Sequence, residues 1–408
     1  MAPLNKKKII NDPVHGFIKI PNERMYDLIQ HPHFQRLRRI RQLGLAEYVY
    51  PGALHTRFHH ALGAMHLMGL ALTTLRQKGF EISEAEMEAA QIAILLHDVG
   101  HGPLSHALEF ILLKDIRHER LSQLIMQGLN QEFGGGLSMA IDIFTDVYPR
   151  RFLHQLVSSQ LDMDRLDYLL RDSFFTGVME GTIGADRIIK MLSLHKDELV
   201  IEEKGIYSVE NFLTARRLMY WQVYLHKTNL SAEQMVIQIL RRAAHLLRKG
   251  KAIEMSAPFR FLLEEAPDWA DFKQNPDFLK AYLSLDDYDI WAGLKAWARH
   301  TDPILSLLSQ FLLQRKLFKL SLTKEKPDEA LIKMQRDRLV SQLKLKPKQA
   351  NYFLVTGSTS NEAYLAKGEK INILTKNGQV RDIAQASDLP NIKALRKLVK
   401  KYFVGWMA

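Results

Sequence analysis

The sequence predicts a mainly α-helical core that contains one short β-hairpin, followed by a small C-terminal α/β region. Two observations predict the core: apolar residues recur at helical spacing through most of the first 320 residues, and only residues 191–203 resemble a hairpin there. A third observation, strand patterns after residue 350, predicts the α/β region. We therefore expect a core over residues 1–320, a polar linker or helix over 321–350, and the α/β region over 351–408.

Helices of the core are recognised from apolar residues three or four positions apart. This pattern covers residues 22–42, 58–78, 84–98, 162–175 and 207–248. Residues 22–42 are expected to form two short helices, the second starting near Pro32. Residues 100–103 end the helix over 84–98, and another helix is expected to begin near Ser105. The last range predicts an interruption near Asn229, because Ser231 and the acidic and amide residues after it are typical of a helix cap.

Strand patterns are short and have recognisable turns. Residues 191–203 turn around Lys196–Asp197, and residues 351–356, NYFLVT, predict a strand. Residues 370–383 carry Asn377–Gly378 between apolar runs, which is typical of a hairpin with a type I′ turn.

Composition limits the chemistry of the protein. The chain has no cysteine, which excludes disulfides, thiolate metal sites, iron–sulfur clusters and cysteine nucleophiles. Any metal must therefore be held by nitrogen and oxygen ligands. The net charge of +11 favours anionic partners such as nucleotides or nucleic acid, although solvated surface lysines are the simpler explanation of the charge alone.

The N-terminus is basic, but no apolar stretch of signal length follows it. No run approaches the roughly 18 apolar residues of a membrane-spanning helix. We therefore expect a soluble cytoplasmic protein that does not enter a membrane.

The strongest functional signal is ILLHDVGHGPLSH, residues 94–106. A helical pattern ends in His97–Asp98, and the glycines after it allow a sharp turn. The imidazole and the carboxylate offer one neutral nitrogen and one anionic oxygen, a pair that suits Fe, Mn, Zn or a similar ion. Turn and capping roles would be the structural explanation of the further histidines at 101, 106 and 118, but packing rarely needs such clustering.

Two other segments can complete a metal site. In TRFHHALGAMH, residues 56–66, Arg57 and His60 share a helix face, so a guanidinium and a metal could neutralise one phosphoryl group together. In LDMDRLDYLLRDSFFTG, residues 161–177, Asp164 taken alone is better explained by a salt-bridged amphipathic helix. The co-occurrence of the three segments changes that interpretation, and the predicted ligands are His60, His97, Asp98 and Asp164.

The order H…HD…D of these ligands resembles that of the HD-domain metal phosphohydrolases. The segments NDPVHGFIKI, QRLRRIRQLGLAEYVYPGALHTRFHHALG, LLHDVGHGPLSH and LDMDRLDYLLRD are similar to the catalytic core of the deoxynucleoside triphosphate triphosphohydrolases. The resemblance is extensive over residues 8–230 and thinner as far as about residue 320.

This resemblance implies that a metal-activated water attacks the α-phosphorus and releases a deoxynucleoside and inorganic triphosphate. It implies a divalent transition metal (Fe, Mn, Zn or Ni), additional Mg with the nucleotide, and a homo-oligomer. The residues that it places on the phosphates are Arg57, His101, His118, Arg216 and Lys227. Those that it places on the nucleoside are Arg165, Tyr168, Asp172 and Tyr224, with Gln42 and Leu43 against the deoxyribose. Without the resemblance, a basic helix face would explain Arg216, Tyr224 and Lys227.

The resemblance also implies a second site, for an activating nucleotide. The matching positions are Lys8, Gln35, Arg38, Arg315 and Lys319. The mammalian member of the family has an aspartate that reads guanine where this chain has Gln30. An amide cannot present two acceptors to guanine as a carboxylate does, so the resemblance does not extend to guanine specificity.

A general acid is needed because the 5′-oxygen of the nucleoside is a poor leaving group unless it is protonated. His106 and Glu109 are three residues apart on the helix expected after Pro103, so the carboxylate would favour the protonated imidazole. A purely structural pair is the alternative, and His118 beside Glu119 is the competing acid. We predict that His106 is the acid, with Glu109 as its partner.

Two other functions are consistent with the sequence. One is a different HD activity, such as that of a phosphodiesterase or nucleotidase, which product analysis on a panel of nucleotides would distinguish. The other is a non-catalytic binder of nucleotides or nucleic acid, which would show steep salt dependence and no turnover. The complete set of four predicted ligands argues against a pure binder, since binding alone does not need it.

Overall fold

The computed structural model describes residues 8–104, 111–113, 116–361, 370–390 and 398–407, together with residues 392 and 395. Over these residues the chain is mainly helical with small β-sheets, as the sequence predicts. The predicted general acid His106 and its partner Glu109 lie outside the described residues. Among the helices that are described, none is both long and apolar enough to cross a membrane.

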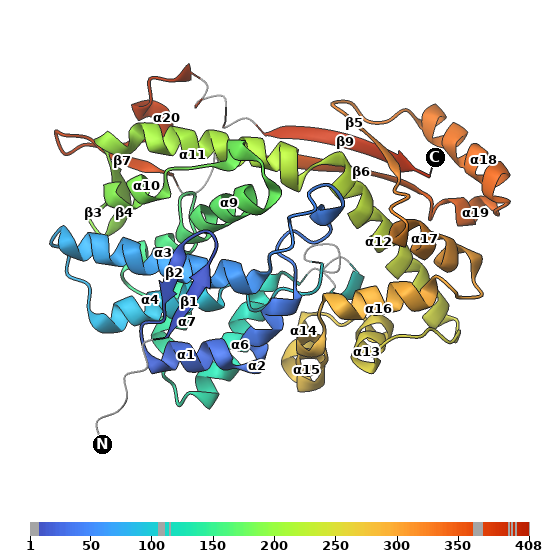
Figure 1. The fold of residues 1–408 in the computed structure, drawn as a ribbon, viewed down its shortest axis with the longest axis horizontal. Coiled ribbons are helices and arrows are strands. Elements are labelled where there is room, and N and C mark those ends of the chain that lie inside the picture. Colours follow the sequence, from blue (N-terminus) through green and yellow to red (C-terminus); the bar gives the residue numbers. More distant parts are fainter. Residues whose placement is uncertain are drawn as a thin grey trace.

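Helix α3 (Arg57–Gln77) lies at the centre of the N-terminal half. Most of its side chains are buried, because it packs against α4 (Glu84–Leu96) on one side and α9 (Met163–Thr176) on another (Figure 1). A helix that is apolar nearly all round is typical of such a central position. The other elements of this half are β1 (Ile9–Asp12), β2 (Gly16–Lys19), α1 (Glu23–Gln30), α2 (Pro32–Gln35), α6 (His118–Glu132), α7 (Ser138–Phe144), α8 (Arg151–Val157), α10 (Ala185–Met191), β3 (Leu192–His195), β4 (Glu198–Glu202) and α11 (Ile206–Met219).

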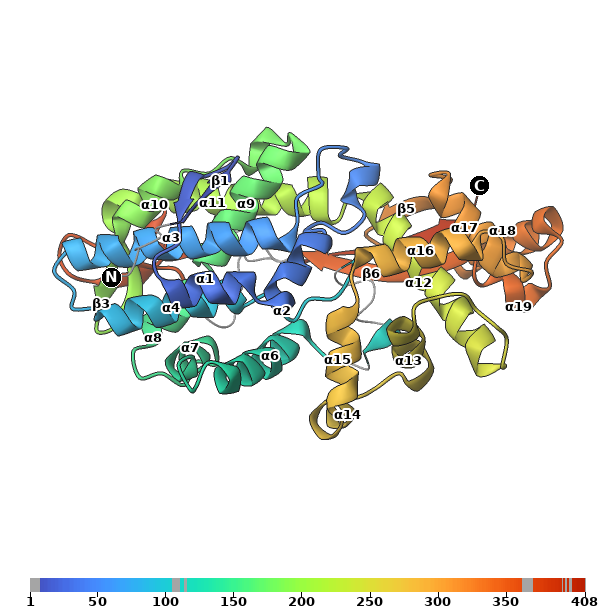
Figure 2. The same cartoon turned by 60° about the horizontal axis from the view of Figure 1, so that its bottom comes forward.

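A second hydrophobic core surrounds α12 (Lys227–Arg248), which packs against α17 (Pro303–Leu313) and β5 (Lys319–Thr323). Figures 1 and 2 both place α17, α18 and α19 at the end of the molecule opposite to α3 and α4, with α14 and α15 nearer its middle. A π-helical turn, Tyr220–Tyr224, connects α11 with this half. Its other helices are α13 (Ala257–Glu265), α14 (Trp269–Gln274), α15 (Pro276–Ser284), α16 (Asp287–Trp297), α18 (Glu329–Leu343) and α19 (Pro347–Ala350).

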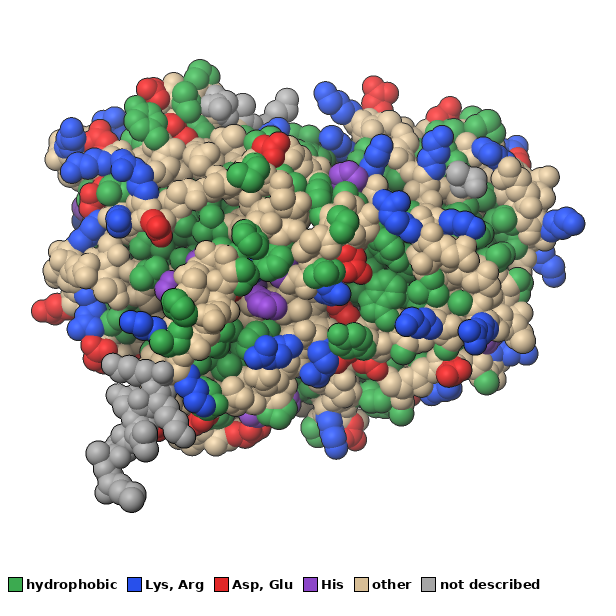
Figure 3. Space-filling model, viewed as in Figure 1, with side chains coloured by type: hydrophobic (Ala, Val, Ile, Leu, Met, Phe, Trp, Pro, Cys, Tyr) green, Lys and Arg blue, Asp and Glu red, His purple; other side chains and the backbone are tan. Residues whose placement is uncertain are grey.

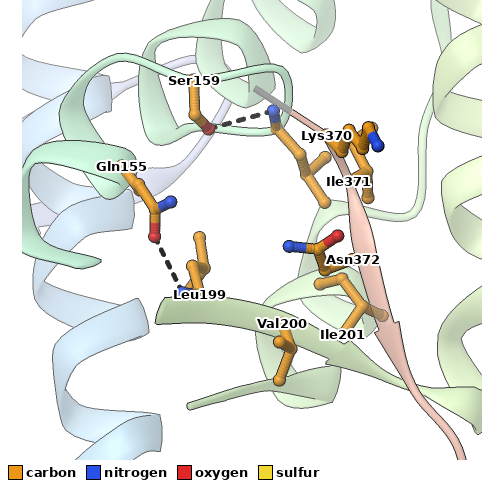
Figure 4. Close-up of a pocket in the computed structure, with 9 residues that line it drawn as sticks. Gln155, Ser159, Leu199, Val200, Ile201, Lys370, Ile371 and Asn372 are labelled. Carbon is orange, nitrogen blue, oxygen red and sulfur yellow. Dashed lines mark hydrogen bonds between the residues drawn. The ribbon is translucent and has the colours of Figure 1, made fainter. Parts of the chain in front are cut away.

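Strands from the C-terminal region pair with both halves. Strand β9 (Val399–Trp406) lies between β5 and β6 (Leu354–Asn361), antiparallel to each. Strand β7 (Asn372–Leu374) pairs in parallel with β4 of the core hairpin, and β8 (Val380–Asp382) follows at the edge, before the short helix α20 (Ile383–Ala386). Figure 4 shows the segment that leads into β7 beside Leu199, Val200 and Ile201. The predicted boundaries at residues 320 and 350 stay predictions, and strand pairing crosses both.

Most of the predicted elements are confirmed. The helices over residues 22–42, 58–78, 84–98 and 162–175 correspond to α1 with α2, α3, α4 and α9. The hairpin at 191–203 turns at Lys196 and Asp197, which both have positive φ. Residues 321–350, predicted as a polar linker or helix, hold the end of β5 and helices α18 and α19.

Two local predictions are wrong. The helical break lies at residues 225–226 rather than near Asn229, because the His226 ring accepts the N–H of Thr228 and caps α12. Ser231 lies inside α12 and donates instead to the carbonyl of Phe318 at 2.8 Å. The β7–β8 hairpin is confirmed, but its turn is not type I′, since Gly378 has positive φ and Asn377 does not.

Candidate metal and nucleotide site

The four predicted metal ligands come from three helices that meet near the start of α3. His60 lies in the first turn of α3, His97 is the residue that ends α4, and Asp98 follows it. Asp164 lies in the first turn of α9, whose start is fixed by the capping side chain of Asp162. The fold therefore brings together residues that are more than a hundred positions apart in the sequence.

The donor atoms of these ligands converge. Nε2 of His60 lies 3.0 Å from Oδ1 of Asp164 and 4.0 Å from Oδ2 of Asp98. Nε2 of His97 lies 3.5 Å from Oδ1 of Asp164 and 3.4 Å from Oδ1 of Asp98. Both imidazole nitrogens are buried, and neither has a hydrogen-bond partner among the described residues. Buried polar atoms are rarely left in this state, and two such nitrogens beside two carboxylates fit a divalent metal ion.

The aspartates and histidines of this cluster shift one another's pKa. Burial opposes a charged His60 imidazole, but the hydrogen bond between its Nδ1 and Asp167 and the charge of the nearby Asp164 carboxylate outweigh it and raise its pKa to about 10. Burial would also favour a neutral Asp164, yet the imidazoles of His60 and His97 lower its pKa. When no metal is bound, the carboxylates therefore favour the protonated form of His60. A divalent cation would take the place of that proton.

The loop after His97 is held against α6 by a close backbone approach. A methyl group at Gly100 would stand 2.3 Å from the backbone nitrogen of Ser122 and 2.4 Å from the carbonyl oxygen of His118. This approach stacks the rings of His101 and His118, with centroids 3.6 Å apart. One donor atom each of Asp98, His101 and His118 also lies within 4.8 Å of the others, so the two histidines adjoin the metal cluster.

Arg36 holds the same loop from the other side. Its fully buried guanidinium donates to the carbonyls of Val99 at 3.0 Å, His101 at 2.7 Å and Leu285 at 3.0 Å. No role for Arg36 was predicted from the sequence. Its place in the basic run QRLRRIR gave no means of telling a buried arginine from an exposed one.

A cavity of about 450 Å³ is lined by two of the predicted metal ligands, Asp98 and Asp164. The predicted site residues that line it are Gln42, Leu43, Arg57, Asp98, His101, His118, Asp164, Arg165, Tyr168, Asp172 and Tyr224. Other residues that line the cavity were not predicted from the sequence. They are Tyr220 and Val223 of the π-helical turn, Leu225 directly after it, and Asn229 and Glu233 of α12. π-Helical turns are rare but often lie at functional sites, and no pattern in the sequence indicated this one.

Both charged and aromatic side chains line this cavity. Arg57 pairs with Asp98 at 2.5 Å, so its guanidinium lies directly beside the predicted metal ligands. The ring centroids of Tyr168 and Tyr224 are 6.0 Å apart, and Tyr224 donates to Asp172 at 2.8 Å. Asp172 also accepts from the buried ring of His55 at 2.8 Å, a partner that the sequence did not predict.

Two predicted phosphate ligands do not line the cavity. Arg216 is buried in α11, where it donates to Gln160 at 3.1 Å. Lys227 is exposed at the first position of α12. Their assignment to the phosphates stays a prediction from the family resemblance.

The residues predicted to bind an activating nucleotide each contact different neighbours in the structure. Gln35 accepts from Arg38 at 2.8 Å, and the Arg38 guanidinium stacks on the ring of Phe58. The ammonium of Lys8 lies 3.4 Å from the centre of the Tyr26 ring. Arg315 donates to the carbonyl of Tyr48, and Lys319 is exposed on β5. The activator site stays a prediction.

Two other features have structural explanations. His31, His33 and Glu132 bring donor atoms within 4.8 Å of one another, but the His31 ring already caps α2 and bonds to Glu132. The crevice drawn in Figure 4, between β4 and β7, is about 20 Å³, room for a single water.

On the face in Figure 3, Lys and Arg are interleaved with Asp and Glu, as on an ordinary solvated surface.

Family comparisons agree with the position of the candidate site. The family model described as the HD domain matches residues 57–169, and the model described as the HD associated region matches residues 183–258. The first match includes all four predicted metal ligands. The two matches together reach from the start of α3 to the start of α13.

Individual proteins are similar over larger parts of the chain. An uncharacterized Bacillus subtilis protein, YwfO, is 33% identical over 398 residues, which are 94% of this chain and 88% of that protein. A crystal structure of a phosphohydrolase from Bacteroides thetaiotaomicron is 51% identical, covers 99% of this chain and 100% of its own, and superposes with a TM-score of 0.96. Human deoxynucleoside triphosphate triphosphohydrolase SAMHD1 is 30% identical over 58% of this chain, a match that spans 44% of the human protein.

Proposed function

The chain belongs to the HD-domain phosphohydrolase family, and from this premise we propose that it hydrolyses deoxynucleoside triphosphates to a deoxynucleoside and inorganic triphosphate. One observation carries the proposal: a single cavity is lined by Arg57 and the predicted ligands Asp98 and Asp164, and also by Tyr168, Tyr224 and Leu43. An anionic chain and an aromatic base are the two groups that such a wall would accommodate. The similarity to triphosphohydrolases supports this substrate class.

The metal would be held by His60, His97, Asp98 and Asp164. This donor set of nitrogen and oxygen atoms suits Fe, Mn, Zn or Ni, and the buried Nε2 atoms of His60 and His97, which lack a hydrogen-bond partner among the described residues, support it. When bound, such an ion lowers the pKa of a water ligand and polarises a phosphoryl group.

Cationic and polar side chains beside the cluster would bind the triphosphate. Arg57 can offer two parallel N–H groups to a phosphate, a geometry that lysine lacks. Burial and the charge of Arg57 hold the pKa of His101 well below its usual range, so this ring is neutral and can donate one hydrogen bond. His118, stacked on His101, would reach the same phosphates, and Mg²⁺ would accompany the nucleotide.

The remaining wall would bind the nucleoside. Leu43 and the tyrosine rings offer apolar and aromatic surface, and Arg165 and Asp172 offer polar groups in the same cavity. The side-chain oxygen of Gln42 is buried and has no hydrogen-bond partner among the described residues, so it is positioned to take a polar contact from the sugar.

The leaving 5′-oxygen would take its proton from His106, with Glu109 holding the ring. This part of the proposal rests on the sequence, since both residues lie outside the described ranges. The homo-oligomer, the activating nucleotide and the cytoplasmic location are likewise proposals that rest on the sequence and the family.

The proposal is tested by incubating metal-loaded protein with the four deoxynucleoside triphosphates, their ribose counterparts, a monophosphate and a phosphodiester. We expect deoxynucleosides and inorganic triphosphate from the first group. Monophosphate hydrolysis or diester cleavage as the main activity would instead indicate another HD phosphohydrolase. Binding without turnover under any metal would indicate a non-catalytic nucleotide binder.

A further inference from the structure

A buried carboxylate that is not among the predicted metal ligands lies behind one of them. Asp167 stands one turn after Asp164 on α9 and has no solvent exposure. Its Oδ2 lies 2.7 Å from Nδ1 of His60, the ring nitrogen that faces away from the metal cluster. A carboxylate on the second nitrogen of a metal-binding histidine fixes the ring and makes the first nitrogen a stronger ligand.

Both oxygens of Asp167 are fully used. Oδ2 accepts from His60 and from Nε of Arg171 at 2.9 Å. Oδ1 accepts from Nε2 of His15 at 2.6 Å and from Nη2 of Arg171 at 2.9 Å. A carboxylate offers about four acceptor positions, so these four contacts leave Asp167 no freedom to turn away from His60.

The network continues into the N-terminal hairpin. Arg171 also donates to Asp12 at 2.7 and 3.3 Å, and Asp12 accepts the backbone N–H of His15 at 2.9 Å. His15 is therefore held at its backbone by Asp12 and at its ring by Asp167. The segment NDPVHG, which carries Asp12 and His15, otherwise has no part in the cavity.

The other histidine ligand has a different support. Nδ1 of His97 bonds to the backbone carbonyl of Ile94 at 2.6 Å, and a carbonyl is neutral. Of the two predicted histidine ligands, His60 has a carboxylate on its second ring nitrogen and His97 has a neutral carbonyl there. Two carboxylates, Asp12 and Asp167, share the Arg171 guanidinium in this network, and the Asp167 carboxylate lies directly behind the His60 ring.

We propose that Asp167, held in place by His15, Arg171 and Asp12, is a positioning residue that sets the metal affinity of His60. The proposal deepens the function proposed above by making the N-terminal hairpin part of the metal site. It does not depend on which phosphoester is hydrolysed.

The test is a titration of metal-stripped, untagged protein with Zn²⁺ against a chromophoric chelator, without any nucleotide. We expect Asp167→Asn to weaken Zn²⁺ binding roughly 10- to 100-fold and His15→Ala to weaken it less, with His15→Gln recovering part of the loss. Asp172→Asn is the matched control, because Asp172 is a buried carboxylate on the same helix that pairs with His55 and Tyr224 instead. It should leave Zn²⁺ affinity unchanged.

A purely structural role predicts a different pattern. If Asp167→Asn and His15→Ala lower the melting temperature of the metal-free protein but bind Zn²⁺ as the parent does, the proposal is wrong. Equal loss of affinity in Asp172→Asn would also overturn it. Failure of the proposed dNTP activity would leave the Zn²⁺ titration unaffected, so the two proposals can fail separately.

Discussion

Gly63 of α3 lies directly against Asp167 of α9: a methyl group at Gly63 would stand 1.9 Å from Oδ1 of Asp167 and 2.3 Å from Nη2 of Arg171. Asp167 cannot retreat, because its two oxygens are held by His60, His15 and Arg171. Because Gly63 has no side chain, Asp167 can lie against the ring of His60, a predicted metal ligand.

We predict that Gly63→Ala destabilises the protein by roughly 1–3 kcal/mol, the cost of overpacking a core, despite the better helix propensity of alanine. Gly128→Ala is the control, because Gly128 lies on α6 where an added methyl group would meet nothing within 4 Å. That change should stabilise by about 0.5–1 kcal/mol. Urea unfolding measures both free energies, and a neutral Gly63→Ala would contradict the tight contact.

Removal of a metal ligand should abolish both metal binding and turnover. We predict this for Asp164→Ala and for the double variant His97→Ala/Asp98→Ala, with far-UV circular dichroism close to that of the parent. The reason is that each change removes donor atoms from a cluster that has no cysteine to replace them. Metal content by elemental analysis and turnover are the measurements, and wild-type activity in either variant would refute the ligand assignment.

Sugar selectivity should follow from the wall formed by Gln42 and Leu43. We predict that dGTP is hydrolysed much faster than GTP, because a cavity closed around a deoxyribose resists an added hydroxyl by roughly 1–3 kcal/mol or more. Leu43→Ala should narrow the difference by removing side-chain volume from this wall. The measurement is kcat/KM for both nucleotides, and equal values in the parent protein would rule out this role of the wall.

The predicted general acid can be separated from the metal ligands. We predict that His106→Ala loses roughly 10²–10⁴-fold in kcat while it keeps its metal, the range expected for a lost proton donor. Glu109→Gln should lose less and should shift one limb of the pH–rate profile. Normal turnover of His106→Ala, or loss of its metal, would exclude the general-acid role.

The sequence was most informative where function needs adjacent residues. His97 and Asp98 are neighbours at the end of a helical pattern, so both the helix and the ligand pair could be predicted locally. The contact between Asp167 and His60 could not, because it joins residues 107 positions apart and LDMDRLDYLLRD contains four aspartates of similar appearance. Ser231 misled the prediction of the helix break for a related reason, since its hydroxyl is used by the distant carbonyl of Phe318.

Local sequence patterns also could not predict which strands pair in the C-terminal region. The hairpin at Gly378 was predictable from its turn residues, whereas the pairing of β9 with β5 joins residues about 80 positions apart. The long separation leaves no periodic signal that specifies the partner. The π-helical turn was not predicted either, although it is local: residues 207–248 show one helical apolar pattern, and nothing in it marks Tyr220–Tyr224 as a different kind of turn.

The most direct test of the central claim is hydrolysis of dGTP by metal-loaded protein in ¹⁸O-labelled water, followed by ³¹P NMR and mass spectrometry of the products. Attack of water on the α-phosphorus predicts unlabelled deoxyguanosine and inorganic triphosphate with one ¹⁸O atom on a terminal phosphate. Release of orthophosphate or pyrophosphate, or ¹⁸O in the deoxyguanosine, would contradict the account.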